Sequence, residues 1–90
     1  MTEASPQIHI SSAVVSVLPA SQAEVSRVLS QMQGVEVFHQ APSKIVIVME
    51  APESGTIGGR LAQIATLDGV LSANMVFEQV ASLAELGEQQ

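Results

Sequence analysis

The sequence repeats one short pattern, and this repetition limits the folds that the chain can adopt. Residues 31–35 (QMQGV) and 66–70 (TLDGV) each end in a Gly-Val pair, which follows a helical stretch and precedes a strand-like one. Glycine suits the left-handed backbone conformation just past the end of a helix. A β-branched stretch also precedes each helical stretch, so the pattern predicts two strand–helix–strand units in tandem.

Two such units in the order βαββαβ predict an α+β, ferredoxin-like domain. The expected strands cover residues 8–17, 35–40, 44–51 and 70–79, and the expected helices cover about 22–33 and 56–67. Right-handed crossovers place both helices on one face of a four-stranded antiparallel sheet, with the first and third strands at its centre. We expect one domain over residues 8–79, with flexible tails over 1–7 and 80–90. At the start of the first helix, Ser21 and Glu24 have the spacing of a capping box.

Composition narrows the class of function. Of the 90 residues, 47% are hydrophobic and none is cysteine, as in a globular domain without disulfides or thiolate metal sites. The formal net charge of -6 disfavours nucleic acid and anionic membrane as partners. No apolar run approaches the roughly 20 residues of a membrane span, and the N-terminus lacks the features of a secretory signal. We therefore expect a cytoplasmic protein.

No catalytic set stands out in the sequence. His9 and His39 lie in different expected strands and have no third ligand, so we expect no metal site. The glycine-containing stretch 55–60 fits neither the dinucleotide fingerprint nor the Walker loop. We therefore expect neither an enzyme nor a cofactor.

The sheet face away from the helices is the informative feature, because it is not cleanly polar as an open face should be. Polar residues decide the alternation: Ser12, Ser16, Glu36, Glu50 and Glu78 are placed on this open face. The helix-covered face then holds Ala13, Val15, Val17, Val35, Val37, Ile45, Ile47, Met49, Leu71, Ala73, Met75 and Phe77. What is left for the open face has an apolar middle and an acidic rim.

We interpret the open face as a platform for an amphipathic basic peptide. The residues assigned to binding are Ser12, Val14, Ser16, Val46, Val48, Glu50, Asn74, Val76 and Glu78, and Phe38 and Ser72 complete the face. Two other interpretations stay open: central strands that are simply valine-rich, and a homodimer formed through this face. A bulge would shift the alternation by one residue and exchange the two faces of a strand.

Several stretches of the chain resemble the NapD family. They are residues 12–15 (SAVV), 34–37 (GVEV), the turn 41–43 (APS), 45–51 (IVIVMEA) and 69–77 (GVLSANMVF), and the resemblance covers residues 8–79. It implies a cytoplasmic chaperone that binds the twin-arginine signal peptide of the molybdenum-containing catalytic subunit of periplasmic nitrate reductase. It further implies that export is held back until the molybdenum cofactor is inserted, and that the chaperone itself carries no cofactor.

The main alternative is a small-molecule regulatory module of the ACT type, which has the same topology. In such modules the loop after the first strand is commonly glycine-rich, whereas here it reads Leu18-Pro19-Ala20. A purely structural dimer is the third hypothesis. Titrations with a twin-arginine peptide and with free amino acids would separate the three.

Overall fold

The computed structural model describes residues 7–82, which form four strands, two α-helices and one 3-10 turn. The strands are β1 (Gln7–Val17), β2 (Val35–Ala41), β3 (Lys44–Ala51) and β4 (Val70–Ser82). The α-helices are α1 (Gln22–Gln31), which follows the 3-10 turn η1 (Pro19–Ser21), and α2 (Ser54–Ile64). Of the tails predicted for residues 1–7 and 80–90, residues 1–6 and 83–90 lie outside the described residues, whereas Gln7 belongs to β1 and residues 80–82 belong to β4. β4 continues to Ser82, past the predicted domain end at residue 79.

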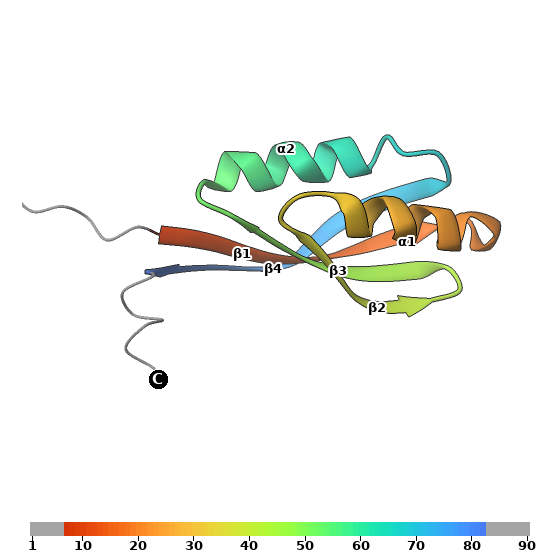
Figure 1. The fold of residues 1–90 in the computed structure, drawn as a ribbon, viewed down its shortest axis with the longest axis horizontal. Coiled ribbons are helices and arrows are strands. Elements are labelled where there is room, and N and C mark those ends of the chain that lie inside the picture. Colours follow the sequence, from red (N-terminus) through yellow and green to blue (C-terminus); the bar gives the residue numbers. More distant parts are fainter. Residues whose placement is uncertain (1–6, 83–90) are drawn as a thin grey trace, which may run out of the picture.

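The sheet has the strand order β2-β3-β1-β4, and β1 pairs antiparallel with both β3 and β4. β2 pairs antiparallel with β3 through the two-residue turn at Pro42 and Ser43. Both helices lie on the same side of the sheet (Figure 1). The predicted ferredoxin-like α+β fold, with the first and third strands at the centre, is confirmed.

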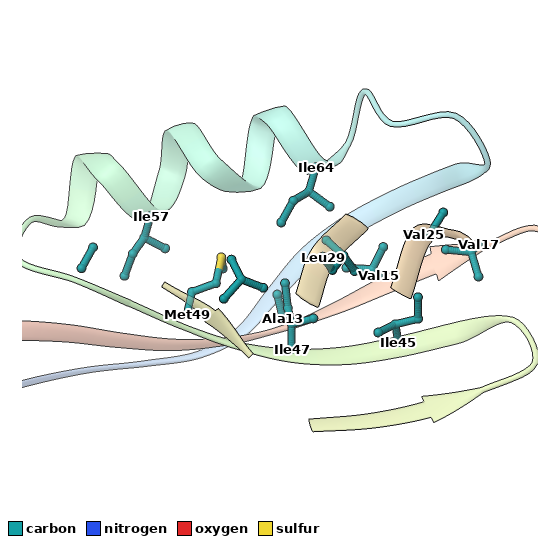
Figure 2. Packing of buried hydrophobic residues seen from close by; sticks show 12 residues of the cluster. Ala13, Val15, Val17, Val25, Leu29, Ile45, Ile47, Met49, Ile57 and Ile64 are labelled. Atoms are coloured by element: carbon teal, nitrogen blue, oxygen red, sulfur yellow. The ribbon is translucent and has the colours of Figure 1, made fainter. Parts of the chain in front are cut away.

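The core lies between the two helices and one face of the sheet (Figure 2). From Ser11 onward in β1, and along β3, every second residue is buried, which is the period of side chains that point to one face of a strand. Val25 and Leu29 of α1, and Ile57 and Ile64 of α2, complete it at helical spacing. Burying one such aliphatic side chain contributes about 1.5–3 kcal/mol to the stability of the fold.

The predicted capping box at the start of α1 does not form, and that expectation was wrong. Ser21 has helical backbone angles (φ -100°, ψ -3°), because the 3-10 turn runs directly into α1. A capping residue needs an extended backbone to aim its oxygen at the first free N–H groups. The Glu24 carboxylate instead accepts hydrogen bonds from the Arg27 guanidinium, and this pair lowers the pKa of Glu24.

Gly34 and Gly69, in contrast, do what the repeated pattern predicts. Both have positive φ, +77° and +90°, just after a helical segment. Each glycine carbonyl accepts a hydrogen bond of 2.9 Å from a neighbouring strand region: Gly34 from the N–H of Glu50, and Gly69 from the N–H of Leu18. A Cβ on Gly69 would lie 2.3 Å from the Cβ of Ser21, so no side chain fits there.

Alanine at two glycines should therefore have opposite effects on stability. Gly69→Ala should lower the free energy of unfolding by about 1–3 kcal/mol, because it combines a left-handed backbone with a steric clash. Gly59→Ala should raise it by up to about 1 kcal/mol, because Gly59 lies inside α2 and a Cβ there meets nothing within 4 Å. Urea denaturation followed by circular dichroism measures both, and equal effects would contradict the assigned role of Gly69.

Candidate functional site

The open face of the sheet, opposite the core, is the candidate site. The residues of β1 that alternate with the buried ones are Ile10, Ser12, Val14 and Ser16, and those of β3 are Val46, Val48 and Glu50. The strands pair Val14 with Val46, Ser12 with Val48 and Ile10 with Glu50. Directly paired residues on one face lie close enough for their side chains to touch. The centre of the face is therefore a continuous apolar strip on two adjacent strands.

A bulge in β4 changes which residues reach this face. Ala13 pairs with Met75 but Ser12 pairs with Phe77, so Val76 is an extra residue and the alternation shifts after it. Phe77 thereby faces the open side with Ser12, and 54% of its surface is exposed. The prediction that Phe77 belongs to the helix-covered face was wrong, because the bulge overrides the alternation.

The same bulge places Glu78 on the helix-covered side of the sheet instead of the open face. It pairs with Ser11, which is fully buried on the helix side of β1. Its Oε2 lies 3.9 Å from Nδ1 of His9, another residue of that side. The placement of Glu78 on the rim of the open face was therefore wrong. His9 is half-buried.

Two further irregularities lie on the edge strands. Between the pairs Ser16–Ser72 and Val17–Val70, Leu71 is the extra residue of β4. Leu71 is 66% exposed. The prediction that it belongs to the helix-covered face was therefore wrong. In β2 the extra residue is Phe38, which is 74% exposed, and beyond it His39 pairs with Val46 on the open face.

Most of the predicted binding residues do lie together. Ser12, Val14, Ser16, Val46, Val48, Glu50 and Asn74 share the open face, because each is paired in register with another member or lies beside one. Val76 is exposed at the bulge, and Glu78 lies on the other side. Ile10 and Phe77 were missed. Ile10 could have been found by extending the alternation of β1 by one more step. For Phe77, the only signal in the sequence was that two apolar residues, Val76 and Phe77, are adjacent, which interrupts the alternation and can indicate a bulge.

Charge is distributed unevenly over the open face. Glu36, paired with Val48, and Glu50, paired with Ile10, lie at one end, where a shallow hollow is lined by Gly34, Val35, Glu36, Val48 and Glu50. Lys44, paired with Ser16, lies at the other end of β3. A ligand that is basic at one end would meet attraction at the glutamate end and repulsion at Lys44. The face can therefore orient such a ligand as well as hold it.

Metal chemistry has no support in the part of the chain that the structure describes. Residues 7–82 contain no group of three His, Cys, Asp or Glu side chains that could hold a metal ion. Among these same residues, neither helix has the length and apolar character needed to cross a membrane. What the open face offers is an apolar strip with carboxylates at one end.

A family model and a similar protein sequence identify the same family. The family model described as "NapD protein" matches residues 8–82. The chaperone NapD of Paracoccus pantotrophus is 40% identical over 73 residues, which cover 81% of this chain and 65% of that protein. The chain thus spans just under two thirds of that relative's length.

Two solved structures share the fold. The solution structure of the E. coli Tat proofreading chaperone protein NapD matches with a TM-score of 0.74 and 24% identity, over 80% of this chain and 78% of that one. A transcriptional regulatory protein of the AsnC family from Pyrococcus furiosus matches with a TM-score of 0.61 and 19% identity, over 89% of this chain and 52% of that one. At such identities the likeness concerns the fold alone.

The new position of Phe77 can be tested by stability. Phe77→Ala should change the free energy of unfolding by less than about 1 kcal/mol, as for a surface residue. Ile47→Ala, in the core of the same sheet, should cost about 2–5 kcal/mol. Chemical denaturation of both variants is the measurement. A loss at Phe77 as large as that at Ile47 would return Phe77 to the core and refute the bulge.

Proposed function

The chain belongs to the NapD family, and we propose that it is a chaperone that binds the twin-arginine signal peptide of the catalytic subunit of periplasmic nitrate reductase. The family match over residues 8–82 and the 40% identity to a protein described as a chaperone support this function. They also agree with the prediction that the chain is not an enzyme. In this proposal the chaperone acts in the cytoplasm and holds back export until the molybdenum cofactor is inserted.

The observation that carries the proposal is the combination of an apolar strip and an acidic end on one uncovered sheet face. Val14, Val46 and Val48 form the middle of the strip, and Phe77 extends it onto β4. An amphipathic peptide helix can lay its apolar side on such a surface. Its arginines then meet Glu36 and Glu50 at the hollow that these two residues help to line. The peptide is thereby bound with its basic segment at this end of the sheet.

The assigned binding residues follow from the same geometry. They are Ser12, Val14, Ser16, Val46, Val48, Glu50, Asn74 and the exposed Val76 from the sequence prediction, with Ile10, Glu36 and Phe77 added from the register and Glu78 removed. Small serine and asparagine side chains beside the valines keep the surface flat enough for a helix to approach. Interface energy usually concentrates in a central desolvated cluster, which here is the group of three valines.

The shape of the face favours a peptide over a small molecule of the ACT type. A small-molecule site is a concave pocket that encloses most of its ligand. The two hollows formed by the described residues near Gly34 and Glu50 are shallow and open. A homodimer would bury the same face without any peptide, so the oligomeric state must be measured with every binding experiment.

A pair of substitutions distinguishes the two faces of the sheet. Val48→Asp should fold and lose measurable binding to a synthetic twin-arginine peptide, because a carboxylate on the uncovered face stays hydrated but interrupts the apolar strip. Val15→Asp should unfold the protein, because its fully buried position offers the charge no partner. Circular dichroism, isothermal titration and light scattering on both variants measure fold, binding and oligomeric state.

Three outcomes would count against the open face. If Val48→Asp binds normally while folded, recognition lies on the loops or the helices. If it unfolds, the face is buried in the native protein and a homodimer becomes the better explanation. If the unsubstituted protein binds free amino acids but no peptide, the small-molecule alternative is correct.

The glutamates give a second test with a control in the same chain. Glu50→Gln and Glu36→Gln should each weaken peptide binding by about 0.2–1 kcal/mol, mainly through slower association. Glu78→Gln should leave binding unchanged, because Glu78 lies on the helix side. Added salt should weaken binding to the unsubstituted protein by screening these charges. Salt-independent binding, or an equal loss in Glu78→Gln, would place the arginine contact elsewhere.

A further inference from the structure

Arg60 stands apart from the other charged groups of the described residues. Of the chain's three cationic residues, Arg27 is paired with Glu24 and Lys44 is exposed at the turn end of β3. Arg60 is half-buried on α2, and its Nη1 is buried without a hydrogen-bond partner in residues 7–82. No carboxylate of these residues lies within 4.0 Å of it. Buried donors of charged groups are normally satisfied by a protein group, a water molecule or an ion, so the unpaired Nη1 of Arg60 requires an explanation.

The surroundings of Arg60 are shaped to admit its guanidinium. A Cβ on Gly34 would lie 2.8 Å from Nη1 of Arg60 and 2.7 Å from the carbonyl oxygen of Glu50. The guanidinium therefore packs directly against the backbone of Gly34, in the space that any other side chain would fill. This contact gives Gly34 a role beyond its backbone conformation.

A second hollow opens at this guanidinium. It is lined by Ile8, Gln33, Gly34, Glu50, Ala51, Pro52, Thr56 and Arg60, and we call it the Arg60 hollow. It shares Gly34 and Glu50 with the hollow at the acidic end of the open face. The two hollows therefore adjoin at the end of β3, where Glu50 lies. Cationic and anionic groups of one ligand could be held on either side of that strand end.

We propose that the Arg60 hollow binds a carboxylate side chain of a peptide, with the Arg60 guanidinium as the donor. The planar guanidinium matches the two oxygens of a carboxylate, and such charge-assisted bonds are about twice as strong as neutral ones. A carboxylate carries one negative charge, whereas inorganic phosphate carries more. The smaller charge suits a hollow lined by Glu50 in a chain of net charge -6. The proposal does not depend on which peptide occupies the open face.

The test uses a minimal peptide carboxylate on the isolated full chain. Titration with N-acetyl-glutamate methylamide, followed by amide NMR at constant ionic strength, should shift the signals of Gly34 and Thr56 saturably. The matched neutral compound, N-acetyl-glutamine methylamide, should not. In Arg60→Gln the affinity should fall about tenfold or more, as expected when a hydrogen bond to a charged group is lost. Arg27→Gln, which removes an exposed arginine on the other helix, should bind as the unsubstituted protein does.

Several results would overturn the proposal. These are no saturable shift with the glutamate compound, equal shifts with the glutamine compound, or unchanged binding in a folded Arg60→Gln variant. Saturable shifts with inorganic phosphate and none with the glutamate compound would assign the hollow to a free anion instead. None of these results bears on peptide binding at Val48. Failure of this site and failure of the proposed function are therefore distinguishable.

Discussion

Strand β1 is the element on which the rest of the structure depends. It pairs along its length with β3 on one side and with β4 on the other. The register of the central strand β3 and of the edge strand β4 is therefore defined by their pairing with β1. One set of its side chains, Ala13, Val15 and Val17, is fully buried under the helices. The alternate set, Ser12, Val14 and Ser16, forms the middle of the open face. Core and candidate site are thus two sides of the same backbone.

The two helices form a single layer, and this arrangement leaves the other face of the sheet uncovered. Both α1 and α2 cover the same side of the sheet, so the domain has one core and one sheet face that no described element covers (Figure 1). When one face of an antiparallel sheet is exposed to solvent, that face commonly carries polar and charged residues. Here valines occupy its centre. The cost of exposing them is offset if a partner covers them, which is why the face and not a cleft carries the proposed function.

The fold itself does not specify the partner. An AsnC-family regulator has the same arrangement of strands and helices at 19% identity, so the function must reside in particular side chains. We propose that in this chain those side chains are the valines of the strip, the glutamates at one end of it and the lysine at the other. Next to the acidic end, the half-buried Arg60 adds a cation that has no carboxylate partner among the described residues. The resulting pattern of charges favours one orientation of an elongated ligand.

The sequence alone was sufficient for features that depend on local periodicity. The order of elements, the two central strands, and the left-handed turns at Gly34 and Gly69 were predicted correctly. So was the burial of Ala13, Val15, Val17, Ile45, Ile47 and Met49, although Ser11 and Ala51 are also buried and were not predicted. Each follows from spacing within a short stretch of chain, because helices and strands impose their own repeats. The family resemblance likewise needed no coordinates, and the match over residues 8–82 confirms it.

Tertiary structure decided what depends on pairing between distant strands. The extra residues Phe38, Leu71 and Val76 exist as bulges only relative to a partner strand, and the bulge at Val76 exchanges the sides of Phe77 and Glu78. Arg60 comes to lie against Gly34 because α2 packs beside the connection between α1 and β2, which no local pattern encodes. Alternation along one strand predicts its faces only while the register holds. Register is a property of two strands, so three-dimensional pairing had to supply it.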